Sequence, residues 1–312
     1  MKKILRILVP LLVALALLLA GCAKTETGKG TIIVGSKLDD EAALLGQMIV
    51  AMLEANGFNV VDRTEFGSTS VVRAAIKSGE LDIYPEYTGN GAFFFDGTDP
   101  EVWSNAQLGY ETVKRLDKHE NDIEWLSPAP ANNTWAIAIT QVLADQAELR
   151  TLDDFATYIN NGGYVKLAAS EEFVNSPAAL PAFQQVYGFS LTQSQLVTFA
   201  GGDSGQTEQA VAQGIDGVNA GMAFATDGEL SALGLVILED PKKAQPVYEP
   251  APIVRGEVFA RYPELATILG PVFITLNNAT LQELNAKIGL EGQLAAVVAR
   301  EYLIEKGFLP VV

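Results

Sequence analysis

The stretch "LDIYPEYTGNGAFFF", residues 81–95, holds the densest group of side chains suited to ligand binding. Aromatic residues recur further along the chain, at Trp135 after "NNT", at Phe224 before "ATDG" and at Tyr248 in "PVYEPAPIVR". The face of an aromatic ring attracts a large, weakly hydrated cation such as trimethylammonium, which has no N–H group to donate. If these segments meet in the fold, they form a site for such a cation.

Histidine and cysteine chemistry has little support in this sequence. His119 is the only histidine, and its charged surroundings indicate a solvated residue. Cys22 is the only cysteine, so the three or four ligands of a zinc site are lacking, and no metal or other cofactor is expected. The motif "GGDSG", residues 201–205, resembles the nucleophile motif of serine proteases, which needs a histidine base. We interpret it as a turn in which Asp203 or Ser204 caps a helix, and a hydrolase using Ser204 is the weaker hypothesis.

The composition describes an acidic globular protein. The chain has 312 residues, more than one core usually covers, so two domains are expected. Hydrophobic residues make up 48% and charged residues 19%, which argues against disorder. The net charge of -17 argues against nucleic acid as a partner, because a basic face is needed to neutralise phosphates. The same charge gives cationic ligands a mildly favourable field.

Residues 1–22 have the features of a targeting segment, with a basic start and the apolar run "ILVPLLVALALLLA". The closing "LAGC" resembles the bacterial lipobox, in which Cys22 becomes the first mature residue and carries lipid. An uncleaved transmembrane anchor is the alternative, but the apolar run is short for a full span. Residues 23–30 are predicted to be a flexible tether. We expect a body anchored by lipid in the cell envelope, on the periplasmic or extracellular face of the cytoplasmic membrane.

Strands and helices alternate after the tether, which predicts βαβ units and a parallel sheet. Residues 31–35 and 58–62 follow a buried-strand pattern, and each precedes an amphipathic helix that ends at a glycine. "LDIYP" is predicted to be a third strand, which Pro85 breaks. Ligands of such sheets bind at the carboxyl ends of the strands, where "GSK", residues 35–37, and "YPEYTGN" lie.

The chain is predicted to cross twice between two lobes. Residues 127–133 form the first crossover, because two prolines interrupt an extended run there. The segment "GVNAGMAFATDGEL", residues 217–230, is interpreted as the way back. The first lobe then comprises residues 31–131 plus 227–312, and the second lobe residues 132–226. Such an insertion creates a hinge, with a cleft between the lobes.

Several motifs together resemble the substrate-binding proteins of ABC importers for quaternary-ammonium osmoprotectants. In order along the chain they are "GSK", "LDIYPEYTGN", "NNTWAIAI", "EEFVNSPAALPAFQQVYGF", "ATDG", "LVILED" and "PVYEPAPIVR". The resemblance implies an α/β fold of the two-lobe type II periplasmic-binding-protein class, with a hinge of two crossovers. It also implies capture of glycine betaine, choline or a similar quaternary amine and delivery to an ABC permease with its ATPase. A monomer without enzymatic activity is expected.

The resemblance assigns an aromatic cage to four residues. By position they are Tyr87, Trp135, Phe224 and Tyr248. Trp135 and Phe224 stand where the family usually has tyrosine, but both keep a ring face.

The resemblance also assigns a polar end to the site, at Lys37, Asn90, Asn133 and Ser176. Lys37 matches a residue that helps to hold a ligand carboxylate. Asn90 replaces a family threonine, and Ser176 stands where the family has an arginine. Because an arginine–carboxylate pair is a strong polar contact, we expect weaker betaine binding than in relatives with the full motif, or a different ligand tail. This pattern resembles a low-affinity, stress-associated subgroup.

Three alternatives stay open at this point. A receptor for an amino acid or a polyamine would differ by an acid that faces the cleft, because a primary amine needs a carboxylate partner. A hydrolase would need a base near Ser204. A scaffold of the cell envelope would have its aromatic residues packed against one another.

Overall fold

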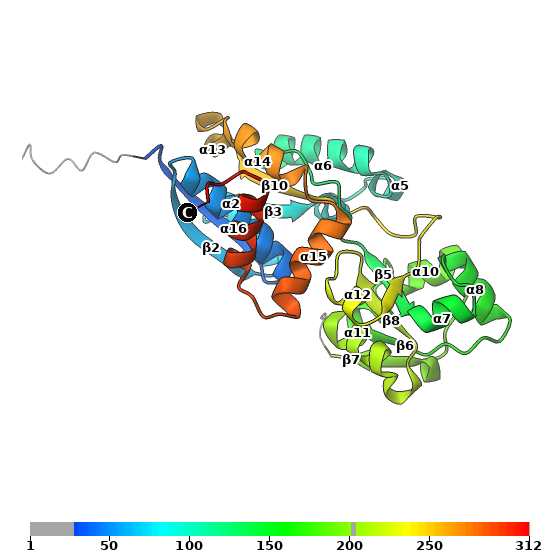
Figure 1. The fold of residues 1–312 in the computed structure, drawn as a ribbon. Coiled ribbons are helices and arrows are strands. Elements are labelled where there is room, and N and C mark those ends of the chain that lie inside the picture. The colour runs from blue at the N-terminus through cyan, green and yellow to red at the C-terminus, as the bar shows by residue number, and fades with distance from the viewer. Residues whose placement is uncertain (1–27, 201–203, 312) are drawn as a thin grey trace, which may run out of the picture.

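The computed structural model describes residues 28–200 and 204–311. Cys22 and the rest of the predicted lipoprotein signal lie outside the described residues, as does Asp203. The described chain forms two α/β lobes, each built on a five-stranded sheet (Figure 1). Within this part of the chain, no helix combines the length and the apolar character needed to span a bilayer. The predicted two-lobe α/β architecture is confirmed.

The sheet of the first lobe has the strand order β2-β1-β3-β10-β4. Its strands are β1 (Thr31–Lys37), β2 (Asn59–Gly67), β3 (Ile83–Tyr87), β4 (Ile123–Trp125) and β10 (Pro250–Arg255). β1 runs parallel to β2 and β3, as the βαβ pattern predicts, whereas β10 runs antiparallel to β3 and β4. The prediction of a wholly parallel sheet is therefore wrong. β3 ends at the side that faces the second lobe, and a chain returning from that lobe starts there, so β10 runs the opposite way.

Strand β3 continues through Pro85 instead of breaking there. Pro85 pairs with Pro252 of β10, and the ladder goes on to Tyr87 opposite Pro250. Proline has no N–H to give to a ladder, so a proline is tolerated where its pair is of the non-hydrogen-bonded kind. The Thr88 amide donates to the Glu249 carbonyl, so the alternating pattern places Pro250, Pro252 and Pro85 all in pairs of this kind. The prediction that Pro85 ends the strand is wrong for this reason.

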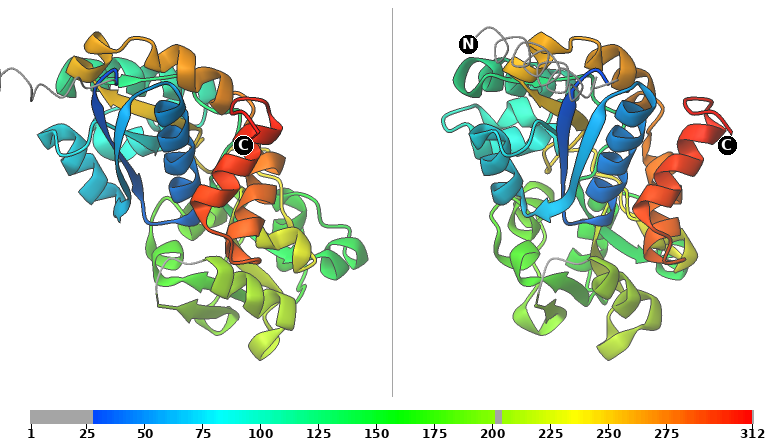
Figure 2. Two further views of the ribbon diagram at one scale, coloured as in Figure 1. Left: turned by 60° about the vertical axis from the view of Figure 1, so that its left-hand side comes forward. Right: turned by 90° about the vertical axis from the view of Figure 1, so that its left-hand side faces the viewer.

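Helix α2 (Asp40–Ala55) fixes the cleft end of the first lobe. Asp39 caps it, because its side chain accepts a hydrogen bond from the Ala42 amide. The apolar face of α2 lies in the main core of the lobe with Leu44, Leu45, Met48, Ile49 and Leu53. α15 and α16 pack beside this helix (Figure 2). The first turn of α2, which carries Glu41, is thereby held at the end of β1.

The other helices of the first lobe cover the two faces of its sheet. They are α3 (Thr69–Ser78), α4 (Gly91–Phe94), α5 (Pro100–Trp103), α6 (Ala106–Asn121), α13 (Gly256–Arg261), α14 (Leu265–Phe273), α15 (Asn278–Gly289) and α16 (Ala295–Glu305). The C-terminal helices close this lobe, as the sequence predicts.

The second lobe repeats the plan with the strand order β7-β6-β8-β5-β9. Its strands are β5 (Trp135–Thr140), β6 (Leu167–Ser170), β7 (Leu196–Phe199), β8 (Ala220–Phe224) and β9 (Leu235–Ile237). Its helices are α7 (Gln141–Gln146), α8 (Leu152–Asn160), α9 (Glu171–Asn175), α10 (Leu180–Tyr187), α11 (Ser204–Gln213) and α12 (Glu229–Ala232). β5 runs antiparallel to β8 and β9.

Because β9 belongs to this sheet, the second lobe extends beyond the predicted boundary at residue 226. The chain returns to the first lobe only through residues 244–249, just before β10. The segment 217–230, interpreted above as the way back, contains β8, an inner strand of the second sheet. Sequence pattern identifies a short apolar strand such as β9 but does not say which sheet it joins.

The two crossovers are bonded to each other. The Asn133 amide donates to the Tyr248 carbonyl at 3.0 Å, and the Tyr248 amide donates to the Asn132 side chain at 2.7 Å. The Thr134 hydroxyl donates to the Pro246 carbonyl at 3.1 Å. The first crossover thus lies where the sequence predicts it. The paired segments form a narrow connection about which the lobes can close.

Candidate ligand-binding site

A cleft of about 1610 Å³ lies between the lobes and is lined by both of them. All four predicted cage residues line it. Tyr87 comes from the first lobe and Tyr248 from the return crossover, whereas Trp135 and Phe224 come from the second lobe. Each stands at a strand end or beside one, because Tyr87 ends β3, Phe224 ends β8, Trp135 begins β5 and Tyr248 precedes β10. The topology brings the four rings to one cleft.

The two rings of the second lobe are held by strand register. Trp135 and Phe224 are direct partners in the antiparallel β5–β8 pair. Their ring centroids lie 6.3 Å apart at an interplanar angle of 27°. Trp135 also meets Phe173 edge to face, with centroids 6.1 Å apart. Both cage rings are half-buried, so each keeps surface toward the cleft while its inner side packs on apolar neighbours.

The tyrosines of the first lobe are held by specific contacts. The Tyr87 hydroxyl donates to Glu41 Oε1 at 2.9 Å, and Lys37 Nζ lies 4.6 Å from the Tyr87 ring centroid. Tyr248 packs against Gly89, where an added Cβ would lie 2.7 Å from the Tyr248 ring. A side chain at position 89 would therefore displace the Tyr248 ring, so the glycine of "YPEYTGN" serves this contact.

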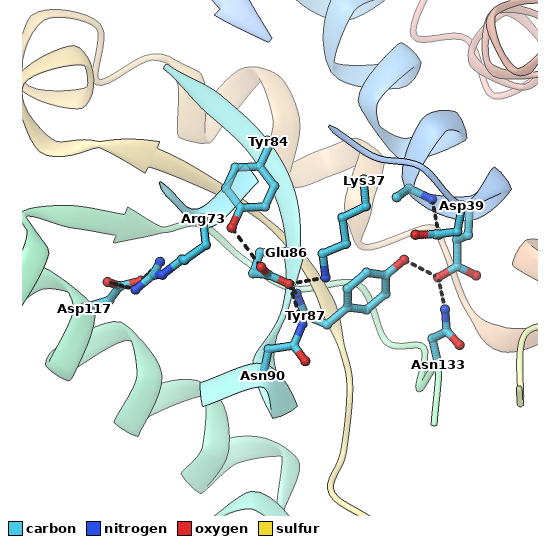
Figure 3. A network of polar contacts seen from close by, with 11 residues as sticks. Lys37, Asp39, Arg73, Tyr84, Glu86, Tyr87, Asn90, Asp117 and Asn133 are labelled. Atoms are coloured by element: carbon cyan, nitrogen blue, oxygen red, sulfur yellow. Dashed lines mark hydrogen bonds and ion pairs between the residues drawn. The ribbon is translucent and has the colours of Figure 1, made fainter. Parts of the chain in front are cut away.

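Lys37 and Asn90 line the cleft, but both are bonded to the buried Glu86 (Figure 3). Lys37 Nζ lies 2.5 Å from Glu86 Oε1, and Asn90 Nδ2 donates to the same oxygen at 2.7 Å. The Tyr84 hydroxyl donates to Glu86 Oε2 at 2.8 Å. Glu86 is fully buried, so the lysine charge is neutralised inside the first lobe. Lys37 is thus already ion-paired at the position where the sequence predicts a partner for a ligand carboxylate.

Arg73 is a second basic residue of the cleft, and the sequence reading did not identify it. Its guanidinium donates to both carboxylate oxygens of Asp117, at 2.8 Å and 2.5 Å, and lies 4.3 Å from the Phe94 ring centroid. Asp117 also accepts from the Trp125 indole at 2.7 Å. This arginine is therefore tied to α6 by a bidentate pair (Figure 3).

Glu41 is the other residue that sequence reading missed. It lines the cleft and is only 4% exposed. Besides Tyr87, its carboxylate accepts hydrogen bonds from Asn133 Nδ2 at 3.0 Å and from Asn285 Nδ2 at 2.9 Å. Burial raises the pKa of this carboxyl, against the hydrogen bonds, which lower it. The predicted polar residue Asn133 thus contacts Glu41 in the structure.

The structure changes the expectation for Ser176 and divides the aromatic run at residues 93–95. Ser176, predicted at the polar end, does not line the cleft, whereas Glu172 of the same segment does. Phe93 is 61% exposed and lines the cleft together with Phe94, whose ring also packs against an apolar core cluster of the first lobe. Phe95 alone of this run is buried.

The geometry gives the hydrolase hypothesis no histidine base. Ser204 lines the cleft at the start of α11, while His119 is an exposed residue in the last turn of α6 and does not line the cleft. No group of acids, histidines and cysteines among the described residues could hold a metal ion.

Negative charge predominates in the cleft. Of the described lining residues, seven are acidic and three are basic. The acids are Asp39, Asp40, Glu41, Glu172, Glu208, Asp227 and Glu229. Two of the three bases, Lys37 and Arg73, are ion-paired with buried acids behind the cleft wall. This surface favours a cation over an anion.

A two-lobe α/β fold with a paired hinge and an aromatic cleft defines a solute-binding protein that closes on its ligand. Residues 30–305 match the OpuAC family, described as the substrate binding domain of the ABC-type glycine betaine transport system. The chain belongs to this family. It is therefore a substrate-binding protein of an ABC-type transport system and not an enzyme, and it works on the extracytoplasmic side of the membrane, as such proteins do.

Individual relatives agree with this assignment. The chain is 54% identical over 275 residues to the glycine betaine-binding protein YehZ of Escherichia coli K12, covering 88% of this chain and 90% of the relative. It is 32% identical over 296 residues to a glycine-betaine-binding protein of Pseudomonas aeruginosa, covering 93% and 91%. The solved structure of apo YehZ from Escherichia coli superposes with a TM-score of 0.79, at 53% identity, over 89% of this chain and 99% of that one.

Proposed function

We propose that this protein captures a quaternary ammonium compound, glycine betaine or choline, between the four rings of the cleft and delivers it to an ABC permease. The observation that carries the proposal is the convergence of Tyr87, Trp135, Phe224 and Tyr248 on one cleft. A trimethylammonium group offers only methyl surface and diffuse charge, which ring faces match. The name of the Escherichia coli relative, a glycine betaine-binding protein, supports the same ligand class.

Closure of the lobes completes the cage in this proposal. Trp135 and Phe224 belong to the second lobe, whereas Tyr87 belongs to the first and Tyr248 to the return crossover. A cleft of about 1610 Å³ exceeds what a single small amine fills, so the rings approach the ligand from both sides as the lobes turn about the hinge. The closed form is the one that docks on the permease and its ATPase.

Lipid on Cys22 would hold the monomeric protein at the membrane surface. The support is the sequence "LAGC" after the basic and apolar segments of residues 1–22. Metabolic labelling with a palmitate analogue, with Cys22→Ser as the control, tests this part of the proposal.

An amine with N–H donors, such as an amino acid or a polyamine, is the second candidate ligand. The observation that favours it is the set of acids lining the cleft, with Glu172 on the second lobe and Asp227 and Glu229 beside the first. A primary ammonium group donates to carboxylates, which a quaternary group cannot do.

Calorimetric titration of the body from Ala23 onward with glycine betaine, choline and spermidine in parallel tests the function. We expect binding of a quaternary amine that Tyr87→Ala abolishes. Binding of spermidine alone would assign the second candidate. No heat and no thermal shift with glycine betaine or choline up to millimolar concentration would contradict the proposed function.

A further inference from the structure

A buried carboxylate without a basic partner lies directly behind the cage. Glu41 is 4% exposed and, among the residues that the structure describes, forms no ion pair. Its hydrogen-bond donors are neutral: the hydroxyls of Tyr87 and Thr226 and the side-chain amides of Asn133 and Asn285. Buried carboxylates are normally paired with a cation, because removing a lone charge from water is costly. The missing positive charge is the feature to explain.

We propose that Glu41 is the counter-charge of the cage, and that the quaternary cation of the ligand is its charge partner. This inference rests on the proposed function, because it requires a cation at the Tyr87 ring. Glu41 would then determine specificity by favouring ligands with a net positive charge over zwitterions of the same head group.

The contacts of Tyr87 place the charge where it can act. The hydroxyl of Tyr87 donates to Glu41 Oε1 at 2.9 Å. A cation over the Tyr87 ring would therefore be separated from this carboxylate only by the tyrosine side chain. Lys37 lies over the same ring, but Glu86 neutralises it at 2.5 Å. Glu41 therefore bonds this ring's hydroxyl with a charge that no basic side chain of the described residues balances. Its position on the hydroxyl also makes the ring more electron-rich, which strengthens cation binding at the ring face.

The amides around Glu41 do not supply the missing charge. Asn133 and Asn285 turn their nitrogens toward the carboxylate, which fixes the orientation of both side chains. Their buried Oδ1 atoms receive no hydrogen bond from the described residues. The second layer around Glu41 therefore consists of acceptors as well, which adds to the negative potential on this side of the cleft.

The sign of the pH dependence follows from the surroundings. The titratable side chains lining the cleft around Glu41 are Asp39 and Asp40 from its own helix turn, Lys37 and Tyr87 from the strands, and Asp227 and Glu229 from the segment after β8. Burial raises the pKa of Glu41, and Asp39 raises it further, while hydrogen bonds from Thr226, Asn285 and Tyr87 lower it. A bound cation stabilises the ionised form of Glu41, so binding lowers its pKa. Binding therefore releases protons when the pH is close to the pKa of the free protein. Affinity for a cation then increases as the pH rises through the pKa of the free protein.

Tetramethylammonium is the sharpest probe, because it has the head group and no tail. Its affinity is measured by calorimetry between about pH 4.5 and about pH 8, in pairs of buffers with different ionisation enthalpies. We expect tighter binding at higher pH and proton release at the acid end for the wild-type protein. Glu41→Gln is expected to weaken binding on the order of tenfold at neutral pH and to flatten the profile. Glu41→Asp keeps the charge and should keep the pH dependence.

Two controls separate the charge of Glu41 from other effects. Glu54→Gln removes an exposed carboxylate at the far end of the same helix, outside the cleft lining, whose charge water screens, and should leave the profile unchanged. Thermal unfolding of each protein at each pH excludes loss of fold. Binding of tetramethylammonium with a flat pH profile, or with the same profile in Glu41→Gln, would overturn the inference alone. No binding of any quaternary amine by the folded wild-type protein would overturn the proposed function, and the counter-charge with it.

Discussion

The two halves of the aromatic cleft are built on different principles. In the first lobe, Tyr87 is 5% exposed and its hydroxyl is bonded to a buried carboxylate. In the second lobe, Trp135 and Phe224 are half-buried, stack on each other and rest on an apolar core. One half is fixed by polar contacts over long sequence distances, and the other half by strand register.

This difference bears on the residues at which the resemblance noted in the sequence implies a tyrosine. By that resemblance Phe224 takes the place of a tyrosine, in a half in which strand pairing already places the ring opposite Trp135. A hydroxyl has no positional role there. At Tyr87 the hydroxyl is the link to Glu41, and the tyrosine is kept. The proposed cage thus uses ring faces from both halves, whereas a hydroxyl group is bonded only at Tyr87 of the first lobe among these three rings.

The largest expected effects come from removing one ring from each half. Tyr87→Ala should weaken binding of a quaternary amine about thirtyfold or more and should lower the free energy of unfolding by about 3 to 5 kcal/mol. Trp135→Ala should weaken binding by a similar factor but cost less stability, because the indole is half-buried. Calorimetry and urea unfolding of both variants measure the two quantities. Equal losses of stability would contradict the contrast between the halves.

The buried ion pair is the next test of the first lobe. Lys37→Met keeps the stem of the side chain but leaves Glu86 charged without a cation, and we expect a loss of about 3 to 5 kcal/mol in the free energy of unfolding. The double variant Lys37→Met with Glu86→Gln removes both charges and should recover much of that loss. If Lys37→Met has the same urea midpoint of unfolding as the wild-type protein, the Lys37–Glu86 pair does not stabilise this half of the cage.

Exchanging hydroxyls between the halves sharpens the comparison further. Tyr87→Phe removes a hydrogen bond to a buried carboxylate and should cost about 1.5 to 3 kcal/mol in the free energy of unfolding. Phe224→Tyr adds a hydroxyl to a half-buried ring and should change the free energy of unfolding by less than about 1 kcal/mol. Urea unfolding of the two variants side by side checks this asymmetry. A larger cost for Phe224→Tyr than for Tyr87→Phe would reverse the assignment of roles.

Local patterns in the sequence predict most of the fold, and the resemblance to a family names four aromatic residues that the fold brings to one cleft. The crossover before Trp135 and the presence of strand β3 follow from neighbouring residues, whereas the end of β3 at Tyr87 depends on its pairing with β10. The polar network could not be predicted in this way, because Glu41 and Tyr87 are 46 positions apart and Lys37 and Glu86 are 49 apart. Such pairs depend on which strand ends meet.

The smallest expected effect comes from introducing, at Ser176 of the second lobe, the arginine that the resemblance noted in the sequence implies. Ser176 does not line the cleft, and its amide donates to the Glu172 carbonyl at the end of α9. An arginine introduced by Ser176→Arg lies four positions after Glu172, at the spacing of a helical ion pair, so Glu172 competes for the guanidinium. We therefore expect the ratio of glycine betaine to choline affinity to change by less than about threefold. Ser176→Lys is the matched control for charge without bidentate geometry. A gain in betaine affinity of about tenfold or more with arginine alone would show that this segment reaches the ligand when the lobes close, and that the second lobe contributes a polar contact as well as its two rings.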